Sequence, residues 1–101
     1  MSATKEQHME ALDRANEIRM ERATLKRSIR AGDVRITEIL QKPVPSWLRA
    51  EPIGRLLKCI PGFGDTRTTK LLQVVPLDYW RTLGNLTARE KAALILRLKE
   101  L

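Results

Sequence analysis

The residues whose types and spacing could do chemistry lie around two glycines, in the stretch Ile60-Pro61-Gly62-Phe63-Gly64. Pro61 ends a helix, Gly62 permits a backbone conformation that other residues rarely adopt, and Phe63 is expected to fill the gap between two helices. Gly64 would leave unpaired backbone amides at the positive end of the next helix, an arrangement that binds phosphate with little preference for base sequence. We predict a phosphate-binding turn made of Gly62, Phe63, Gly64, Thr66, Arg67 and Lys70. The alternative is a turn that only joins two helices.

A second candidate site lies on the long helix expected at residues 4–31. At about 100° per residue, its basic and acidic side chains separate onto different faces beside an apolar stripe of Ala11, Ala15, Ile18, Leu25 and Ile29. A helix that is merely solvated more often mixes Glu and Lys four residues apart. We therefore predict nucleic-acid contacts from Arg19, Lys26 and Arg30, and leave open a protein partner for the acidic face of Glu6, Glu10, Asp13, Glu17 and Glu21.

The charge of the chain supports a polyanionic partner. Its 101 residues, enough for one domain, include 19 Lys and Arg against 12 Asp and Glu, a formal net charge of +7. A small domain this basic most often binds nucleic acid, although charge that serves solubility alone is the alternative.

The same composition argues against catalysis and metal binding. One cysteine, Cys59, excludes an internal disulfide and a cysteine zinc site, and one histidine, His8, leaves no partner set for triad or multi-histidine chemistry. Asp33, Asp65 and Asp78 are scattered, and each fits a capping or turn position. We expect no enzyme activity, no cofactor and no metal, and a soluble, cytoplasmic protein, because neither a membrane span nor a signal peptide is evident.

Helical periodicity and helix breakers predict an all-α fold of about five helices. Residues Thr4 and Gln7 fit a capping box for the first helix, and Gly32 fits its C-terminal end. The prolines at 43 and 45 mark a boundary between residues 1–42, with the long helix and a short one, and a body at residues 43–101. Further helices are expected at 34–41 with Asp33 as its cap, around Trp47, at 53–59, at 65–74 and from a capping box at Thr87 and Glu90. Trp47 and Cys59 are expected in the core.

These features together resemble the actinobacterial integration host factors, small basic nucleoid-associated proteins. The similarity runs from Leu25-Lys26-Arg27 and Gly32 through Ile36-Thr37-Glu38-Ile39-Leu40, Leu56-Leu57 and the glycine turn to Arg81, Leu83-Gly84 and the helix from Thr87. It implies a long N-terminal helix on a helix-two-turn-helix body, a motif shared with a small-subunit ribosomal protein and some DNA repair enzymes. It also implies sequence-tolerant binding of double-stranded DNA, with bending or compaction of the DNA, and support of phage integrase reactions. A divergent, phage-encoded member of the family fits the same resemblance.

The resemblance adds Arg81 to the predicted DNA contacts, and two positions depart from the family's pattern. Asp65 stands where the family tends to carry lysine, and Tyr79 and Trp80 stand in a loop that is arginine-rich in the family. The two aromatic side chains are expected to cover the core, with stacking on sugars or bases as the alternative.

The leading hypothesis is thus a monomeric DNA-binding protein of the nucleoid with no membrane partner. RNA binding is the first alternative, by analogy with the ribosomal relative of the glycine turn. A protein adaptor that presents the acidic face of the first helix, for instance to an integrase, is the second.

Overall fold

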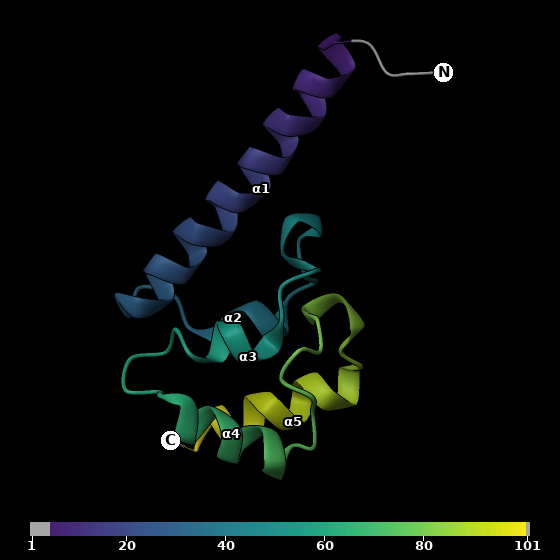
Figure 1. Cartoon of the computed structure of the whole chain (residues 1–101). Helices are drawn as coiled ribbons and strands as arrows, with labels where there is room; N and C mark the ends of the chain where they lie inside the picture. Colours follow the sequence, from purple (N-terminus) through teal and green to yellow (C-terminus); the bar gives the residue numbers. More distant parts are fainter. Residues whose placement is uncertain (1–4, 101) are drawn as a thin grey trace.

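A computed structural model describes the backbone of residues 5–100 and the side chains of residues 11–100. Its helices are α1 (Lys5–Arg30), α2 (Ile36–Gln41), α3 (Ile53–Leu57), α4 (Asp65–Val74) and α5 (Ala88–Lys99), with short 3₁₀ turns at Ser46–Leu48 and Leu83–Asn85. Between residues 5 and 100 the β pairing is limited to one isolated bridge, between Pro52 and Thr82. The predicted all-α fold is confirmed. The molecule measures 51 × 27 × 24 Å because α1 projects from a small helical body (Figure 1).

α1 ends at Arg30, and Gly32 closes its C-terminal end as the sequence predicts. This glycine has φ of 81°, its amide bonds to Ile29 O at 3.1 Å, and the amide of Asp33 bonds to Ser28 O at 2.9 Å. These two bonds form a Schellman motif, which satisfies the last helical carbonyls. The predicted capping box at Thr4 and Gln7 lies outside the residues whose side chains are described.

The core gathers apolar side chains from both sides of residue 43. Ile29 of α1 and Leu40 of α2 are buried in the same cluster as Leu56, Leu83 and Leu94 of the later elements. Each such side chain contributes about 1.5–3 kcal/mol when it leaves water. Cys59 is 3% exposed, as predicted, and Trp47 packs half-buried against the cluster.

The second and third helices differ from the predicted ones. α2 begins at Ile36 instead of Val34 with Arg35 as its N-cap, because the amides of Asp33 and Val34 both turn back to Ser28 O. Asp33 therefore does not cap α2, and the predicted cap is wrong.

The third helix is also shorter than predicted. α3 begins at Ile53 as predicted, with Pro52 as its N-cap, but ends at Leu57 instead of Cys59. The first amides of α3, those of Ile53 and Gly54, donate to Arg81 O at 2.8 Å and Tyr79 O at 3.0 Å. A distant loop thus caps the helix, which no local pattern reveals.

The last helix begins at the predicted capping box. Thr87 Oγ1 accepts from the amide of Glu90 at 3.1 Å, and Glu90 Oε1 accepts from the amide of Thr87 at 2.9 Å. Arg81 reaches the same carboxylate at 3.0 Å. The bond from the Thr87 amide lowers the pKa of Glu90 most, with the Thr87 hydroxyl and the charge of Arg81 adding to it. The box therefore joins α5 to the loop that caps α3.

Candidate nucleic-acid interface

The two glycines of the turn differ in whether their backbone conformation requires glycine. Gly62 has φ of 80°, the left-handed region that favours glycine, and the amide of Phe63 then bonds to Ile60 O at 2.9 Å. Phe63 is half-buried and packs on the core, as predicted. Gly64 has φ of −105°, open to any residue, and a Cβ added to it would meet nothing within 4 Å. Folding requires a glycine at position 62 and not at position 64.

Gly64 is the N-cap of α4, which begins at Asp65 as predicted. No side chain caps this helix, and its first turn therefore presents unpaired amides to the outside. Unpaired amides and the helix dipole together attract anions, and phosphate binding at this turn stays a prediction.

The carboxylate of Asp65 turns away from these amides toward the end of α3. Lys58 Nζ lies 2.7 Å from Asp65 Oδ1. The bond to Asp65 raises the pKa of Lys58 most, followed by the bond to Tyr79. The pair is exposed and adds little stability, but it neutralises the one acidic charge of the turn.

A basic groove lies between α1 and α3. Its volume is about 540 Å³, and its charged lining consists of Arg19, Arg22, Lys26, Arg27, Arg30, Glu51 and Arg55. The three residues predicted on α1 do share one groove. The prediction omitted Arg55, which tertiary packing brings from α3. Its spacing of three residues from Lys58 in an otherwise apolar segment was the available signal, since residues three apart share a helix face.

Two polar contacts hold α1 against this groove. Arg22 Nε donates to Trp47 O at 2.7 Å, and Lys26 Nζ lies 2.6 Å from Glu51 Oε1. Glu51 is 2% exposed, so its carboxylate is buried at the floor of the groove. The opposite charges of Lys26 and Glu51 therefore meet at this buried position.

Aromatic side chains connect the groove to the glycine turn. The Arg55 guanidinium lies 5.1 Å from the centre of the Trp80 ring, and Lys58 Nζ lies 4.9 Å from that of Tyr79. The two rings meet edge to face at 4.8 Å. Tyr79 is half-buried over Gly54, whose missing Cβ makes room for it, so its predicted place on the core is confirmed.

Trp80 differs from its neighbour. It is 60% exposed and is not among the side chains that pack on the core, so the prediction that it covers the core is wrong. The carboxylate of Asp78 accepts from the Trp80 amide at 2.8 Å and fixes a tight turn that leaves the indole in solvent.

We call the groove, Arg55, Lys58, Trp80 and the first turn of α4 together the basic surface.

The remaining predicted site residues lie at different places. Thr66 and Lys70 are exposed on α4, beside the turn. Arg67 lies next to Gly62, with a guanidinium nitrogen 3.8 Å from where a Cβ of that glycine would be. Arg81 donates to Asn85 O at 3.1 Å and to Glu90, so its guanidinium also has a structural role. Its contact with DNA stays a prediction.

Among the described residues no three His, Cys, Asp or Glu side chains come close enough to share a metal ion. None of the helices that the structure describes is long and apolar enough to cross a membrane. Cys59 is buried, with its thiol 3.4 Å from Arg55 O.

Comparison with known proteins gives one informative match. No protein-family model matches the sequence, and no curated protein matches it. Among solved structures, that of sIHF bound to an 8bp palindromic DNA matches with a TM-score of 0.71 and 20% identity, over 87% of this chain and 96% of that one. The two chains share a fold. The architecture expected from the resemblance to integration host factors is thus confirmed.

Proposed function

We propose that this protein binds double-stranded DNA through the basic surface, largely without regard to base sequence, as an architectural protein. The observation that carries the proposal is the continuity of that surface. Arg55 lines the groove and touches Trp80, and Lys58 joins Tyr79 to the first turn of α4. This chain of contacts joins arginines, a helix N-terminus without a side-chain cap and an exposed aromatic ring, and we infer that they contact one polyanion together.

The chemistry of this surface suits the phosphate backbone. Arginine forks and helix-terminal amides bind phosphate oxygens, which position a protein on the duplex without reading its bases. The exposed indole of Trp80 can stack on a sugar or base, or insert between base steps, as wedges of bending proteins do. The structural relative was solved with DNA bound, which supports the same ligand here.

A salt-dependent gel shift on random duplex DNA tests the proposal. With about six phosphate contacts, we expect the affinity to fall on the order of a thousandfold between about 50 and about 200 mM salt. Duplexes of different sequence should bind within a few-fold of one another. An affinity indifferent to salt would overturn the proposal, and tighter binding of structured RNA of equal length would favour the RNA alternative.

Bending and compaction form the finer part of the proposal. A duplex labelled at both ends with a donor and an acceptor dye should show higher energy transfer on binding if the DNA bends. Unchanged transfer at saturating protein would limit the function to coating the duplex. We further propose that the protein acts as a monomer on the nucleoid in the cytoplasm and without catalysis.

A protein partner is a second candidate, favoured by one observation. Asp13, Glu17 and Glu21 are all exposed on the projecting part of α1 and belong to none of the ion pairs formed by the described side chains. Glu6 and Glu10, which were predicted on the same face, lie outside the residues whose side chains are described. We propose an integrase as the partner. Partners that disappear from a pull-down after nuclease treatment would instead indicate tethering through DNA.

A further inference from the structure

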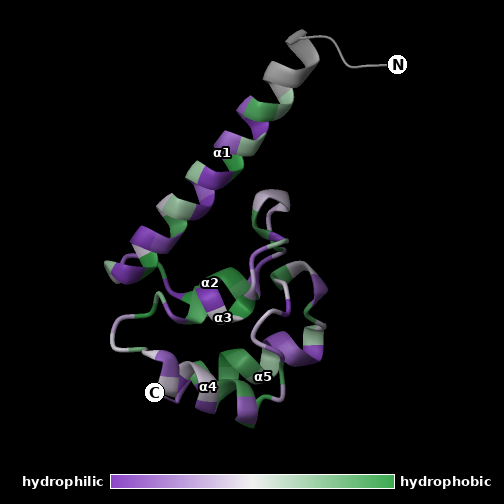
Figure 2. Cartoon of the chain, viewed as in Figure 1, coloured by the Kyte–Doolittle hydropathy of each residue, from purple (hydrophilic) through white to green (hydrophobic). Residues whose placement is uncertain are grey.

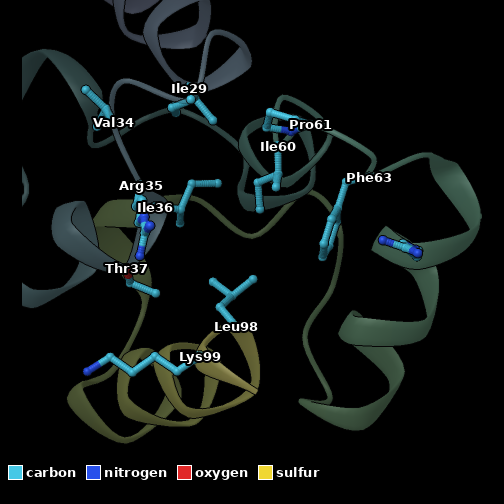
Figure 3. Close-up of a pocket in the computed structure, with 12 residues that line it drawn as sticks. Ile29, Val34, Arg35, Ile36, Thr37, Ile60, Pro61, Phe63, Leu98 and Lys99 are labelled. Carbon is cyan, nitrogen blue, oxygen red and sulfur yellow. The ribbon is translucent and has the colours of Figure 1, made fainter. Parts of the chain in front are cut away.

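A second hollow, separate from the basic groove, lies between the C-terminal end of α1, α2, the glycine turn and the end of α5. Its volume is about 550 Å³. Its apolar lining is Ile29, Val34, Ile36, Ile60, Pro61, Phe63 and Leu98, and Figure 3 shows these side chains around a common space. Ile29 and Ile36 are buried beneath it, whereas Ile60, Phe63 and Leu98 are partly exposed. Pockets that hold small molecules fall in the range of about 300–1,000 Å³ and are mostly apolar with a few polar groups.

Three cations border this apolar lining, each from a different element. Arg35 precedes α2, Arg67 belongs to α4 and Lys99 ends α5. None of the described acidic residues pairs with them, because the ion pairs among these residues join other cations. No acidic side chain lines the hollow, so the charged side chains that line it are all cations.

We propose that this hollow binds a small organic carboxylate with an apolar body, such as a medium-chain fatty acid or an aryl carboxylate. The apolar body would lie against the partly exposed side chains of Ile60, Phe63 and Leu98, where it leaves water. The carboxylate would lie at the rim, where Arg35 offers a bidentate fork and Lys99 a point charge.

Charge complementarity selects this occupant over the alternatives. A phosphate backbone gains nothing from an apolar lining, and an uncharged hydrocarbon gains nothing from the cations at the rim. The hydroxyl of Thr37, which also lines the hollow, supplies one more donor to a carboxylate.

Titration of the whole chain with decanoate, followed by amide chemical shifts, tests the proposal, with decanol as the uncharged probe of equal length. We expect decanoate to shift amides around Arg35, Thr37 and Lys99 and to bind about tenfold more tightly than decanol, the value of one charge-assisted contact. Equal affinity for the two probes, or shifts spread over residues 11–21 or the basic groove, would overturn it.

A matched pair of variants separates the rim from the general charge of the protein. Arg35→Ala with Lys99→Ala removes two exposed cations at the rim, and Lys42→Ala with Arg89→Ala removes two exposed cations elsewhere. The first pair should weaken decanoate about tenfold and leave decanol unchanged, and the second should change neither. An equal loss in both pairs would show that decanoate responds only to net charge. An acidic amphipathic peptide that binds where decanoate does not would equally refute a small-molecule site.

Discussion

A side chain at Gly64 is compatible with folding but is expected to interfere with DNA binding. Its φ of −105° suits any residue, and an added Cβ would meet nothing within 4 Å. Gly62, two residues earlier, has φ of 80°, so a side chain there strains the backbone. Substitution of each glycine by alanine therefore distinguishes a turn that binds phosphate from a turn that only joins helices.

The expected effect of Gly64→Ala on stability is small. Alanine is a poorer N-cap than glycine by about 1 kcal/mol, while the loss of unfolded-chain freedom returns about 0.4–1 kcal/mol. The two terms nearly cancel, and the free energy of unfolding should change by less than about 0.5 kcal/mol. Gly62→Ala should instead cost about 1–2 kcal/mol, because alanine would have to adopt the left-handed region.

The expected effect of Gly64→Ala on DNA binding is much larger. A methyl group at the mouth of the α4 N-terminus keeps a phosphate from the first-turn amides. Loss of one charge-assisted hydrogen bond costs about 1.5–3 kcal/mol, so the Kd for duplex DNA should rise about 10- to 100-fold.

Fluorescence anisotropy with a labelled random duplex at low salt measures the affinity, and urea unfolding measures the stability. Gly64→Glu should weaken binding further, and Ala92→Glu, with the same charge change at an exposed position of α5, serves as its control. If Gly64→Ala binds DNA as tightly as the unmodified protein, the turn is structural only and the phosphate-binding reasoning is refuted.

The contacts of Lys26, Glu90 and Trp80 each determine a property that can be measured. Lys26→Ala leaves the buried carboxylate of Glu51 unpaired, so it should lower the free energy of unfolding in urea by about 2–3 kcal/mol. This is below the usual cost of breaking a buried ion pair because Lys26 is partly exposed. If the double variant with Glu51→Gln recovers no stability, the pair does not have this role. The pKa of Glu90 is lowered by folding, so its contribution to stability is present above the usual carboxyl range and is lost as pH falls through the lower folded value. Between about pH 6 and about pH 3 the Tm of Glu90→Gln should therefore fall less than that of the unmodified chain, and equal losses would exclude this role. DNA binding should quench the exposed indole of Trp80, and Trp80→Phe should lose the quenching while the half-buried Trp47 keeps its emission; quenching that persists would place the contact at Trp47.

The features that sequence predicts well are those determined within one helical turn. α4 spans Asp65–Val74 as predicted, because a glycine and a proline bracket it. The Schellman end at Gly32 and the capping box at Thr87 also rest on residues close in sequence. In each case the hydrogen-bonding partners are at most five residues apart, so the chain's order alone identifies them.

The features that sequence misses depend on contacts across the fold. Asp33 has a good capping side chain, but its amide serves the end of α1 and shifts the start of α2. Tyr79 and Trp80 are adjacent aromatic residues with the same expected place, yet only Tyr79 finds the space left by Gly54. Arg55 joins the groove because α3 packs beside α1, and helical periodicity within either segment does not show that packing.

The polar contacts in the C-terminal half of α1 determine which face of the helix lines the groove. In Figure 2, green hydrophobic positions alternate with purple hydrophilic ones along the projecting part of α1. Leu25 and Ile29 alone would hold the helix on the body but would resist its rotation weakly. Arg22 and Lys26 bind single atoms of Trp47 and Glu51, so they set the rotation.

At about 100° per residue the centre of the groove-lining cations is about 150° around α1 from that of Asp13, Glu17 and Glu21. A rotation of α1 by one residue would therefore move acidic side chains toward the basic surface. A buried ion pair is seldom a source of net stability, but it can select one arrangement among several. We infer that the Lys26–Glu51 pair selects the rotation of α1 that keeps the surface free of acidic charge. The pair of substitutions Lys26→Met and Glu51→Leu should then leave the fold stable and yet weaken DNA binding by more than the single charge of Lys26 accounts for.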